Sequence, residues 1–290
     1  MPELPEVEGV VNSLKPVATG KTINKVIISS VVENAHLHGR QAIIKGSSLV
    51  QFCHDLEGAK IVQVVRRSKY IYFHLLINNE RKLLVSHLGM SGAWFYVQHT
   101  LDITEEKFRK HIHVQFQLDD EMLLVYADIR RFGEMRLLDS ELQFPPLLLM
   151  APEPFEEYAL AHFLQMSLLP KYQQKSIKET IMDGHVISGC GNIYATEALF
   201  RMRIHPGRTV KRISEQRKIQ LFKEIVDVLN ESISAGGSSI SDYRNLNGEA
   251  GSMQNRLQIY GRKTCPSCGQ PVKQKVLGGR NSWYCSSCQR

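Results

Sequence analysis

Four cysteines near the C-terminus have the residue types and spacing of a metal site. They form two CxxC pairs separated by 16 residues: Cys265, Cys268, Cys285 and Cys288. Such pairs are typical of a tetrahedral four-thiolate zinc site, in which a hairpin, here with Gly278 and Gly279 at its tip, brings the two turns together. Because cysteines fill all four ligand positions, we expect one zinc ion with a structural role.

The N-terminus carries a second group that could take part in a reaction. An initiator methionine before a small residue such as Pro2 is usually removed, which leaves a secondary amine. An α-amino group has a pKa of about 8, so a sizeable share is unprotonated at neutral pH and can attack an aldehyde-like carbon. Glu3 and Glu6 lie next to this amine, and a carboxylate can shuttle protons there if burial raises its pKa. By itself the segment also fits an ordinary helix start with Pro5 in the first turn.

Composition and charge restrict the class of protein. The chain has 290 residues, of which 43% are hydrophobic and 22% charged, so we expect a globular protein of two domains. It has no apolar run of about 18 residues and no signal-peptide pattern, which predicts a soluble, cytoplasmic protein without a membrane partner. The net charge of +7 favours a partner that carries phosphates, although a merely basic enzyme would have the same charge.

The elements that must position these groups fall on either side of a proline-rich stretch, Pro145–Pro154. Before it, a short N-terminal helix that ends at Pro16 precedes β-rich runs at 23–29, 61–77, 82–86, 94–98, 113–118, 122–127 and 134–138, with a turn at Asp119–Asp120. After it, helical patterns occupy 155–166, 176–182, 193–201 and 214–234. We therefore predict an α+β protein with a two-layer β-sandwich and flanking helix over 1–145, a linker over 146–155, a helical domain over 156–256 and a cysteine module over 257–290.

Short motifs follow one another in a fixed order along the chain. They are MPELPEVE at 1–8, RRSKY at 66–70, HLGMSG at 87–92, RRFG at 130–133, GNIYA at 191–195 with Glu197, IHP at 204–206, YGR at 260–262, and the cysteine module. In this order and at these separations, the chain resembles bacterial formamidopyrimidine-DNA glycosylases, which excise oxidised purines such as 8-oxoguanine. The resemblance implies that 156–256 is a helix-two-turn-helix DNA-binding domain with a lesion-capping loop, and that 257–290 is a zinc finger.

The resemblance also implies catalytic roles. Pro2 would attack the sugar C1′, expel the damaged base and form a Schiff base, with Glu3 as the proton donor. Lys69, in a β-strand, would assist elimination and touch a phosphate, and Arg280 of the finger would serve the second elimination and grip phosphates. Glu6 and Glu197 would support the amine. Base release and β,δ-elimination would then leave a one-nucleotide gap.

A further set of residues would handle the DNA. A base inside a duplex has to be flipped out, and the hole has to be filled. By resemblance, Met90, Arg130 and Phe132 would fill it, although Met90 and Phe132 taken alone fit core positions better. His87 is more in keeping with ordering the Met90 loop than with acid–base chemistry.

Phosphate contacts complete the implied DNA surface. Asn192, directly after two glycines, is expected to cap a helix and, with Lys178, to hold phosphates. His111 matches a DNA contact of the family, and it also fits a strand residue on a solvated face. The expected partner is double-stranded DNA with oxidised purines or abasic sites, bound by a monomer.

Some positions depart from the family pattern. Met253 stands in the capping loop where phenylalanine is common, Asn281 and Ser282 replace a small residue and threonine, and the approach to Cys265 is about two residues short. Two alternatives stay open. One is an endonuclease VIII-like glycosylase for oxidised pyrimidines, which Leu4 speaks against, and the other is a non-catalytic zinc-ribbon binder of damaged DNA.

Overall fold

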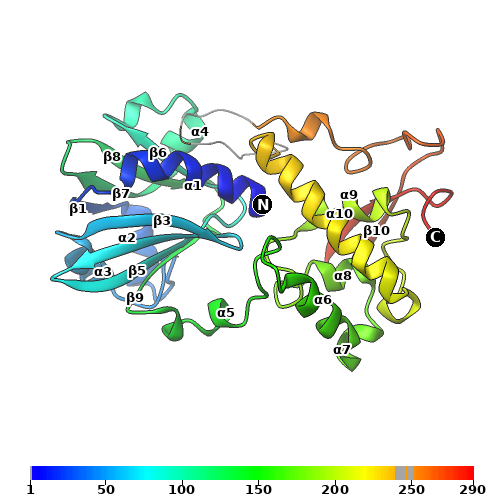
Figure 1. Ribbon diagram of the computed structural model, residues 1–290. Coiled ribbons are helices and arrows are strands. Elements are labelled where there is room, and N and C mark those ends of the chain that lie inside the picture. Colours follow the sequence, from blue (N-terminus) through cyan, green and yellow to red (C-terminus); the bar gives the residue numbers. More distant parts are fainter. Residues whose placement is uncertain (1, 239–245, 247–250) are drawn as a thin grey trace. The chain divides into compact units, whose positions relative to one another are not determined.

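The computed structural model in Figure 1 describes residues 2–238, 246 and 251–290. The chain divides into two compact units: 1–148 with 236–252, and 149–235 with 253–290. The segment 236–252, which the sequence analysis grouped with the helices, belongs to the first unit, where the backbone of Ser238 bonds to Glu6 and Leu246 joins the core. Among the described residues, no helix is both long and apolar enough to cross a membrane.

The first unit is a sandwich of two sheets, which confirms the predicted fold class. One sheet has the strand order β1-β7-β8-β6, formed by Ile23–Ile28, Ile112–Leu118, Leu123–Asp128 and Gly92–Val97. The other has the order β2-β9-β5-β4-β3, formed by Ile43–Ile44, Glu134–Leu138, Glu80–His87, Tyr70–Ile77 and Lys60–Arg67. Fully buried Trp94 packs against Phe73 of the opposite sheet, with ring centroids 5.4 Å apart, so the core lies between the sheets.

Helix α1 (Leu4–Ala18) packs alongside β3 and carries the predicted apolar face (Figure 1). Its buried residues include Val7, Val10, Val11 and Leu14. The expectation that Pro16 ends the helix was wrong, because α1 continues to Ala18. A proline so near the end of a helix removes one backbone bond only, and the complete burial of Ala18 in the sandwich core stabilises the last turn.

Two other features of this unit differ from the sequence prediction. The run 61–77 is two strands, β3 and β4, joined by a two-residue turn at Ser68–Lys69 in which Ser68 has a φ of 56°. Helices α2 (Ser30–Leu37), α3 (Leu49–Leu56) and α4 (Glu106–Arg109) were not predicted. Ser29 and Ser48 cap α2 and α3 by accepting backbone N–H bonds, so the capping serines were the overlooked signal. The turn at Asp119–Asp120 is confirmed.

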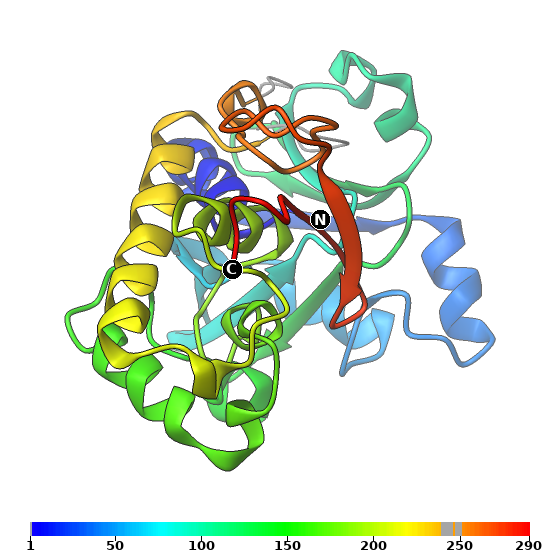
Figure 2. The same ribbon diagram turned by 90° about the vertical axis from the view of Figure 1, so that its right-hand side faces the viewer.

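The second unit is helical and ends in a hairpin. Its elements are α6 (Ala159–Leu168), α7 (Pro170–Gln173), α8 (Ile177–Ile181), α9 (Asn192–Arg201), α10 (Glu215–Ser234), β10 (Lys273–Leu277) and β11 (Arg280–Tyr284), with short 3₁₀ helices at Val210–Arg212 and Met253–Asn255. The first unit has further short helices at Thr100–Asp102, Glu141–Gln143 and Pro145–Leu148. Helix α10 packs against α9 and α6, and Tyr194 bonds to Ser232 across 2.6 Å. Figure 2 shows the β10–β11 hairpin in red.

Candidate functional site

The N-terminal segment is fixed by the carboxylate of Glu6. Pro2, Glu3 and Glu6 are all buried, and Glu3 is the N-cap residue of α1. Glu6 Oε2 accepts the backbone N–H of Glu3 at 2.8 Å, and Oε1 accepts the N–H of Ser238 at 2.7 Å. Both oxygens of Glu6 therefore hold backbone in place, which suits a supporting group next to residue 2 better than a proton carrier.

Lys69 lies in a turn, and the expectation that it sits within a strand was wrong. The β3–β4 turn that carries it is tied to α1, because Arg66 Nε donates to Glu8 at 2.5 Å and Arg66 also donates to the Ser68 carbonyl at 3.1 Å. A two-residue hairpin turn restricts its backbone to a few conformations. The pair Arg66–Glu8 thus links the position of Lys69 to the helix that begins at the N-terminus.

Two neighbouring loops carry the three residues that were predicted to fill the void in DNA. Met90 lies half-buried in the turn between β5 and β6, and Arg130 and Phe132 lie in the loop between β8 and β9. Phe132 is 59% exposed, so it is not a core residue, and the Arg130 guanidinium lies 5.0 Å from the centre of its ring. An exposed aromatic ring with a cation stacked on it is well suited to contact stacked bases.

Glycines allow these two loops to touch through their backbones. A Cβ atom on Gly89 would lie 2.4 Å from the Gly133 nitrogen, and one on Gly133 would lie 1.8 Å from the Tyr126 hydroxyl. Such distances exclude any side chain at either position. Buried Asp128, which the sequence analysis missed, bonds to both loops; its position at the end of an apolar strand was the available signal.

His87 orders the Met90 turn, as predicted. Its Nδ1 accepts the backbone N–H of Gly89 at 3.2 Å. Burial lowers the pKa of His87 to about 4, so the ring is neutral at physiological pH and Nδ1 keeps the lone pair that this bond needs.

This pKa predicts a pH-dependent contribution to stability. In the unfolded chain His87 takes up a proton below pH 6.5, whereas in the folded chain it does so only near pH 4. The free energy of unfolding should therefore fall as the pH drops through this window, by about 3 kcal/mol for this group. In chemical denaturation from neutral to acidic pH, His87→Asn should remove that part of the fall while keeping an acceptor for Gly89. His54→Asn, at an exposed position, should leave the whole fall in the free energy of unfolding unchanged. Equal plots of this free energy against pH for His87→Asn and wild type would contradict the lowered pKa of His87.

His111 stands directly before β7 and is half-buried. Its Nδ1–H donates to the Lys107 carbonyl at 2.6 Å, which fixes the ring. The predicted DNA contact by this residue stays a prediction.

In the second unit, helices α8 and α9 are joined by two turns and place Lys178 and Asn192. The expectation that Asn192 caps α9 was wrong: Gly191 is the N-cap residue, and Asn192 is the first residue of the helix. Within the described part of the chain, the buried Oδ1 of Asn192 has no hydrogen-bond partner. A polar amide at a helix N-terminus, where backbone N–H groups point outward, suits an anionic ligand.

Lys178 is completely buried, which the sequence did not suggest. Its ammonium group donates to Thr196 Oγ1 of α9 and to Ser282 Oγ of β11, both at 2.8 Å. The hydroxyl of Ser282 thus takes part in joining the hairpin to the helices, although serine departs from the family's threonine there. Whether Lys178 also holds a phosphate stays a prediction.

Glu197 is another buried carboxylate that accepts backbone N–H groups. Its oxygens accept N–H bonds from Gln258 at 2.7 Å, Ile259 at 3.0 Å and Tyr260 at 2.8 Å. These three bonds fix the segment that leads from Met253 into the cysteine module. Met253 itself is fully buried in a short helix, and the earlier part of the predicted capping loop, 248–250, lies outside the described residues.

The four cysteines of the hairpin module come together as predicted. Their sulfur atoms all lie within 4.8 Å of one another, with 3.9 Å between Cys265 and Cys288 and 3.5 Å between Cys268 and Cys285. A tetrahedral zinc ion with bonds of about 2.3 Å needs sulfurs about 3.8 Å apart, so the cluster can hold a metal ion of this kind. Gly278 and Gly279 form the hairpin tip, both with positive φ, and exposed Arg280 follows.

Loss of this metal site should unfold the module. Cys285 is fully buried, so Cys285→Ser should lower the zinc content and the thermal stability of the protein, as should a chelator. Metal analysis and calorimetry would measure both effects. Cys53→Ser, in the sandwich unit, is the matched control and should change neither. Unchanged stability in the metal-free Cys285→Ser protein would rule out a structural metal.

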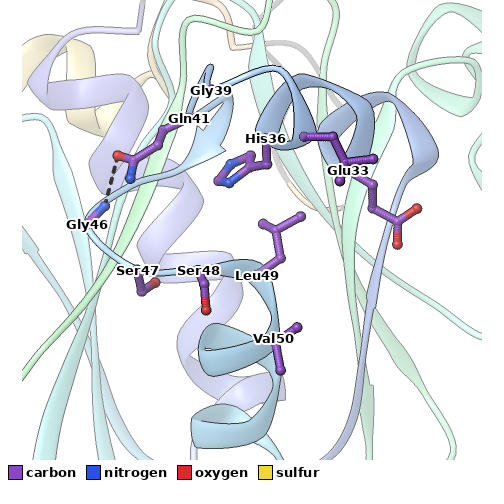
Figure 3. Close-up of a pocket in the computed structure, with 10 residues that line it drawn as sticks. Glu33, His36, Gly39, Gln41, Gly46, Ser47, Ser48, Leu49 and Val50 are labelled. Atoms are coloured by element: carbon purple, nitrogen blue, oxygen red, sulfur yellow. Dashed lines mark hydrogen bonds between the residues drawn. The ribbon is translucent and has the colours of Figure 1, made fainter.

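A cavity of about 870 Å³ lies in the sandwich unit, lined by residues of α2, α3 and the segment between them (Figure 3). Its lining includes Glu33, His36, Leu37 and Leu49, and the N–H of Gly46 donates to Gln41 Oε1 at 3.2 Å. None of the predicted site residues is among its lining residues, so the candidate site does not coincide with this cavity.

A β-sandwich, a helix-two-turn-helix and a four-cysteine hairpin in one chain are the parts of a DNA-processing protein, and the comparisons with known proteins identify which kind. Residues 1–135 match the family model described as the formamidopyrimidine-DNA glycosylase N-terminal domain, and residues 150–244 match its H2TH domain. The formamidopyrimidine-DNA glycosylases of Bacillus licheniformis and Halalkalibacterium halodurans are 37% and 39% identical to the chain, with 100% of both chains covered.

Solved structures support the same family. The Lactococcus lactis Fpg in complex with DNA that contains an abasic site is 30% identical, with a TM-score of 0.83 over 100% of both chains. The Thermus thermophilus MutM (Fpg) protein is 32% identical, with a TM-score of 0.81 over 99% of this chain and 98% of that one. The chain therefore belongs to the formamidopyrimidine-DNA glycosylase family. It is a DNA glycosylase of base excision repair.

Proposed function

We propose that the enzyme removes oxidised purines, such as 8-oxoguanine and formamidopyrimidines, from duplex DNA and then cleaves the abasic strand by β,δ-elimination. Its Lactococcus lactis relative has been solved with DNA containing Fapy-dG and with DNA containing an abasic site, which supports both steps. The observation that carries the proposal is the buried N-terminal segment, in which Glu6 anchors the backbone at Glu3 and Ser238 and so fixes the surroundings of residue 2.

The chemistry begins at the imino nitrogen of Pro2, once Met1 has been removed. This nitrogen attacks C1′ of the damaged nucleotide, the bond from C1′ to the base breaks, and Glu3 donates a proton to the departing base. The amine nitrogen then gives its own proton to the Glu3 carboxylate, which passes it to O4′ as the sugar ring opens to the iminium. The resulting iminium acidifies C2′, whose proton is then lost as the 3′ phosphate leaves. A second elimination expels the 5′ phosphate, with Lys69 and Arg280 assisting.

DNA recognition is divided between the two units. Met90, Arg130 and Phe132 enter the space left by the extruded nucleotide, and Arg130 can donate to the orphaned cytosine. Asn192, Lys178 and His111 hold phosphates. Exposed Arg280 reaches the flanking phosphates from a hairpin that one zinc ion, held by the four cysteines, stabilises. The enzyme works as a monomer on chromosomal DNA in the cytoplasm.

The roles of the acid and the amine can be separated with two substrates. Glu3→Gln should slow excision of 8-oxoguanine opposite cytosine by about 10²-fold or more, since a carboxamide cannot donate the proton. Borohydride trapping on a preformed abasic site, where no base has to leave, should be affected far less. Single-turnover kinetics and gel analysis of the trapped adduct measure the two steps.

The matched control is Glu33→Gln, which changes an acid on α2 away from the N-terminus and should leave both steps unchanged. Equal losses of excision and trapping in a folded Glu3→Gln protein would contradict the acid role. Rapid excision of thymine glycol with slow excision of 8-oxoguanine would favour the pyrimidine-specific alternative. Tight binding of abasic DNA without any cleavage would favour the non-catalytic one.

A further inference from the structure

Asp128, the last residue of β8, is completely buried and carries bonds to two different loops. Its Oδ1 accepts the hydroxyl of Ser91 at 2.7 Å and the backbone N–H of Arg130 at 3.1 Å. Its Oδ2 accepts the backbone N–H of Gly133 at 2.7 Å. One carboxylate therefore bonds to the turn that follows Met90 and to both ends of the segment that holds Arg130 and Phe132.

Ser91 adds a direct hydrogen bond between the two loops. Its Oγ, which donates to Asp128, also accepts the N–H of Arg130 at 2.9 Å, and the serine is 2% exposed. Together with the backbone contact of Gly89 with Phe132 and Gly133, these bonds leave the two loops little freedom to move separately.

Joining two loops through a buried carboxylate is energetically unfavourable unless the carboxylate is fully hydrogen-bonded. Removing a charged group from water costs free energy unless hydrogen bonds replace its hydration, and a well-packed apolar residue can often stabilise a fold better. Here all three donors to Asp128 come from the loops with the void-filling residues, and its backbone carbonyl accepts from His113 Nε2 at 3.0 Å. These bonds therefore fix the positions of the two loops relative to each other.

We propose that Asp128 is a positioning residue that locks the Met90 turn and the Arg130–Phe132 loop into one rigid wedge, so that extrusion of the base, and not bond cleavage, depends on it. This inference rests on the proposed function, because the wedge matters only where a paired base has to leave the duplex. Asp128 touches neither the amine nor the reacting sugar in this scheme. Its effect should therefore depend on how the lesion is paired.

The test compares one lesion in two pairings. Asp128→Asn places an NH₂ group against donors that face the carboxylate, so at least one loop loses its bond. Single-turnover excision of 8-oxoguanine opposite cytosine should slow by about tenfold, because extrusion costs more when the wedge is loose. Excision of the same lesion opposite a stable abasic analogue, where no pair has to be broken, should change by less than about twofold.

Asp120→Asn is the matched control. Asp120 lies in the turn at the other end of β8 and also has three partners, Lys21 at 2.7 Å, Tyr96 at 2.8 Å and Met122 at 3.2 Å. Its variant should cut both substrates at wild-type rates. Ser91→Ala, which leaves the carboxylate and its Gly133 bond in place, should show the same selective slowing at a smaller size and decides the question if Asp128→Asn does not fold.

Each outcome has a distinct meaning. Equal slowing on both substrates, or none on either, for folded Asp128→Asn and Ser91→Ala would overturn the positioning role. Wild-type protein that cuts neither substrate would instead overturn the proposed function.

Discussion

A carboxylate withdrawn from water must accept hydrogen bonds, and at three buried acids of this enzyme most of the donors are backbone N–H groups outside the sheets. Glu6 holds residue 3 and residue 238, Asp128 holds Arg130 and Gly133, and Glu197 holds residues 258–260. Backbone donors have no rotamers to order, so each acid fixes a segment that no sheet or long helix would fix. Glu6 holds the segment next to Pro2, Asp128 holds the loop with Arg130 and Phe132, and Glu197 holds the segment that leads into the cysteine module, so the proposed site depends on all three carboxylates.

In the second unit, a buried cation joins separate segments of the chain. The buried ammonium group of Lys178 finds its partners in the hydroxyls of Thr196 and Ser282, and so joins three elements that are distant in sequence. The cysteine cluster holds the base of the hairpin, while the tip with Arg280 stays exposed. A hairpin that is fixed at its base and bonded to the helices can present one cation to a phosphate at small entropic cost.

Much of this architecture could be predicted from the sequence, and the exceptions have physical causes. Period-two alternation located the strands, and the spacing of Cys265 to Cys288 predicted the metal cluster, because both signals are local. Pro16 and the split of 61–77 misled the prediction because packing of Ala18 and a positive φ at Ser68 depend on tertiary structure. The role of Asp128 escaped because it accepts mainly backbone N–H groups, which leave no pattern in the sequence. The burial of Lys178 escaped because its partners Thr196 and Ser282 are distant in sequence, and a single charged residue in a sequence does not reveal whether it is exposed.

In the proposed reaction, the nucleophile is the imino nitrogen of residue 2. Intact-mass and peptide analysis of the active enzyme, before and after borohydride reduction on abasic DNA, tests it most directly. We expect a chain that begins at Pro2 and a reduced adduct on its N-terminal peptide. A chain that keeps Met1 and still nicks the DNA, or an adduct on any lysine, would contradict it.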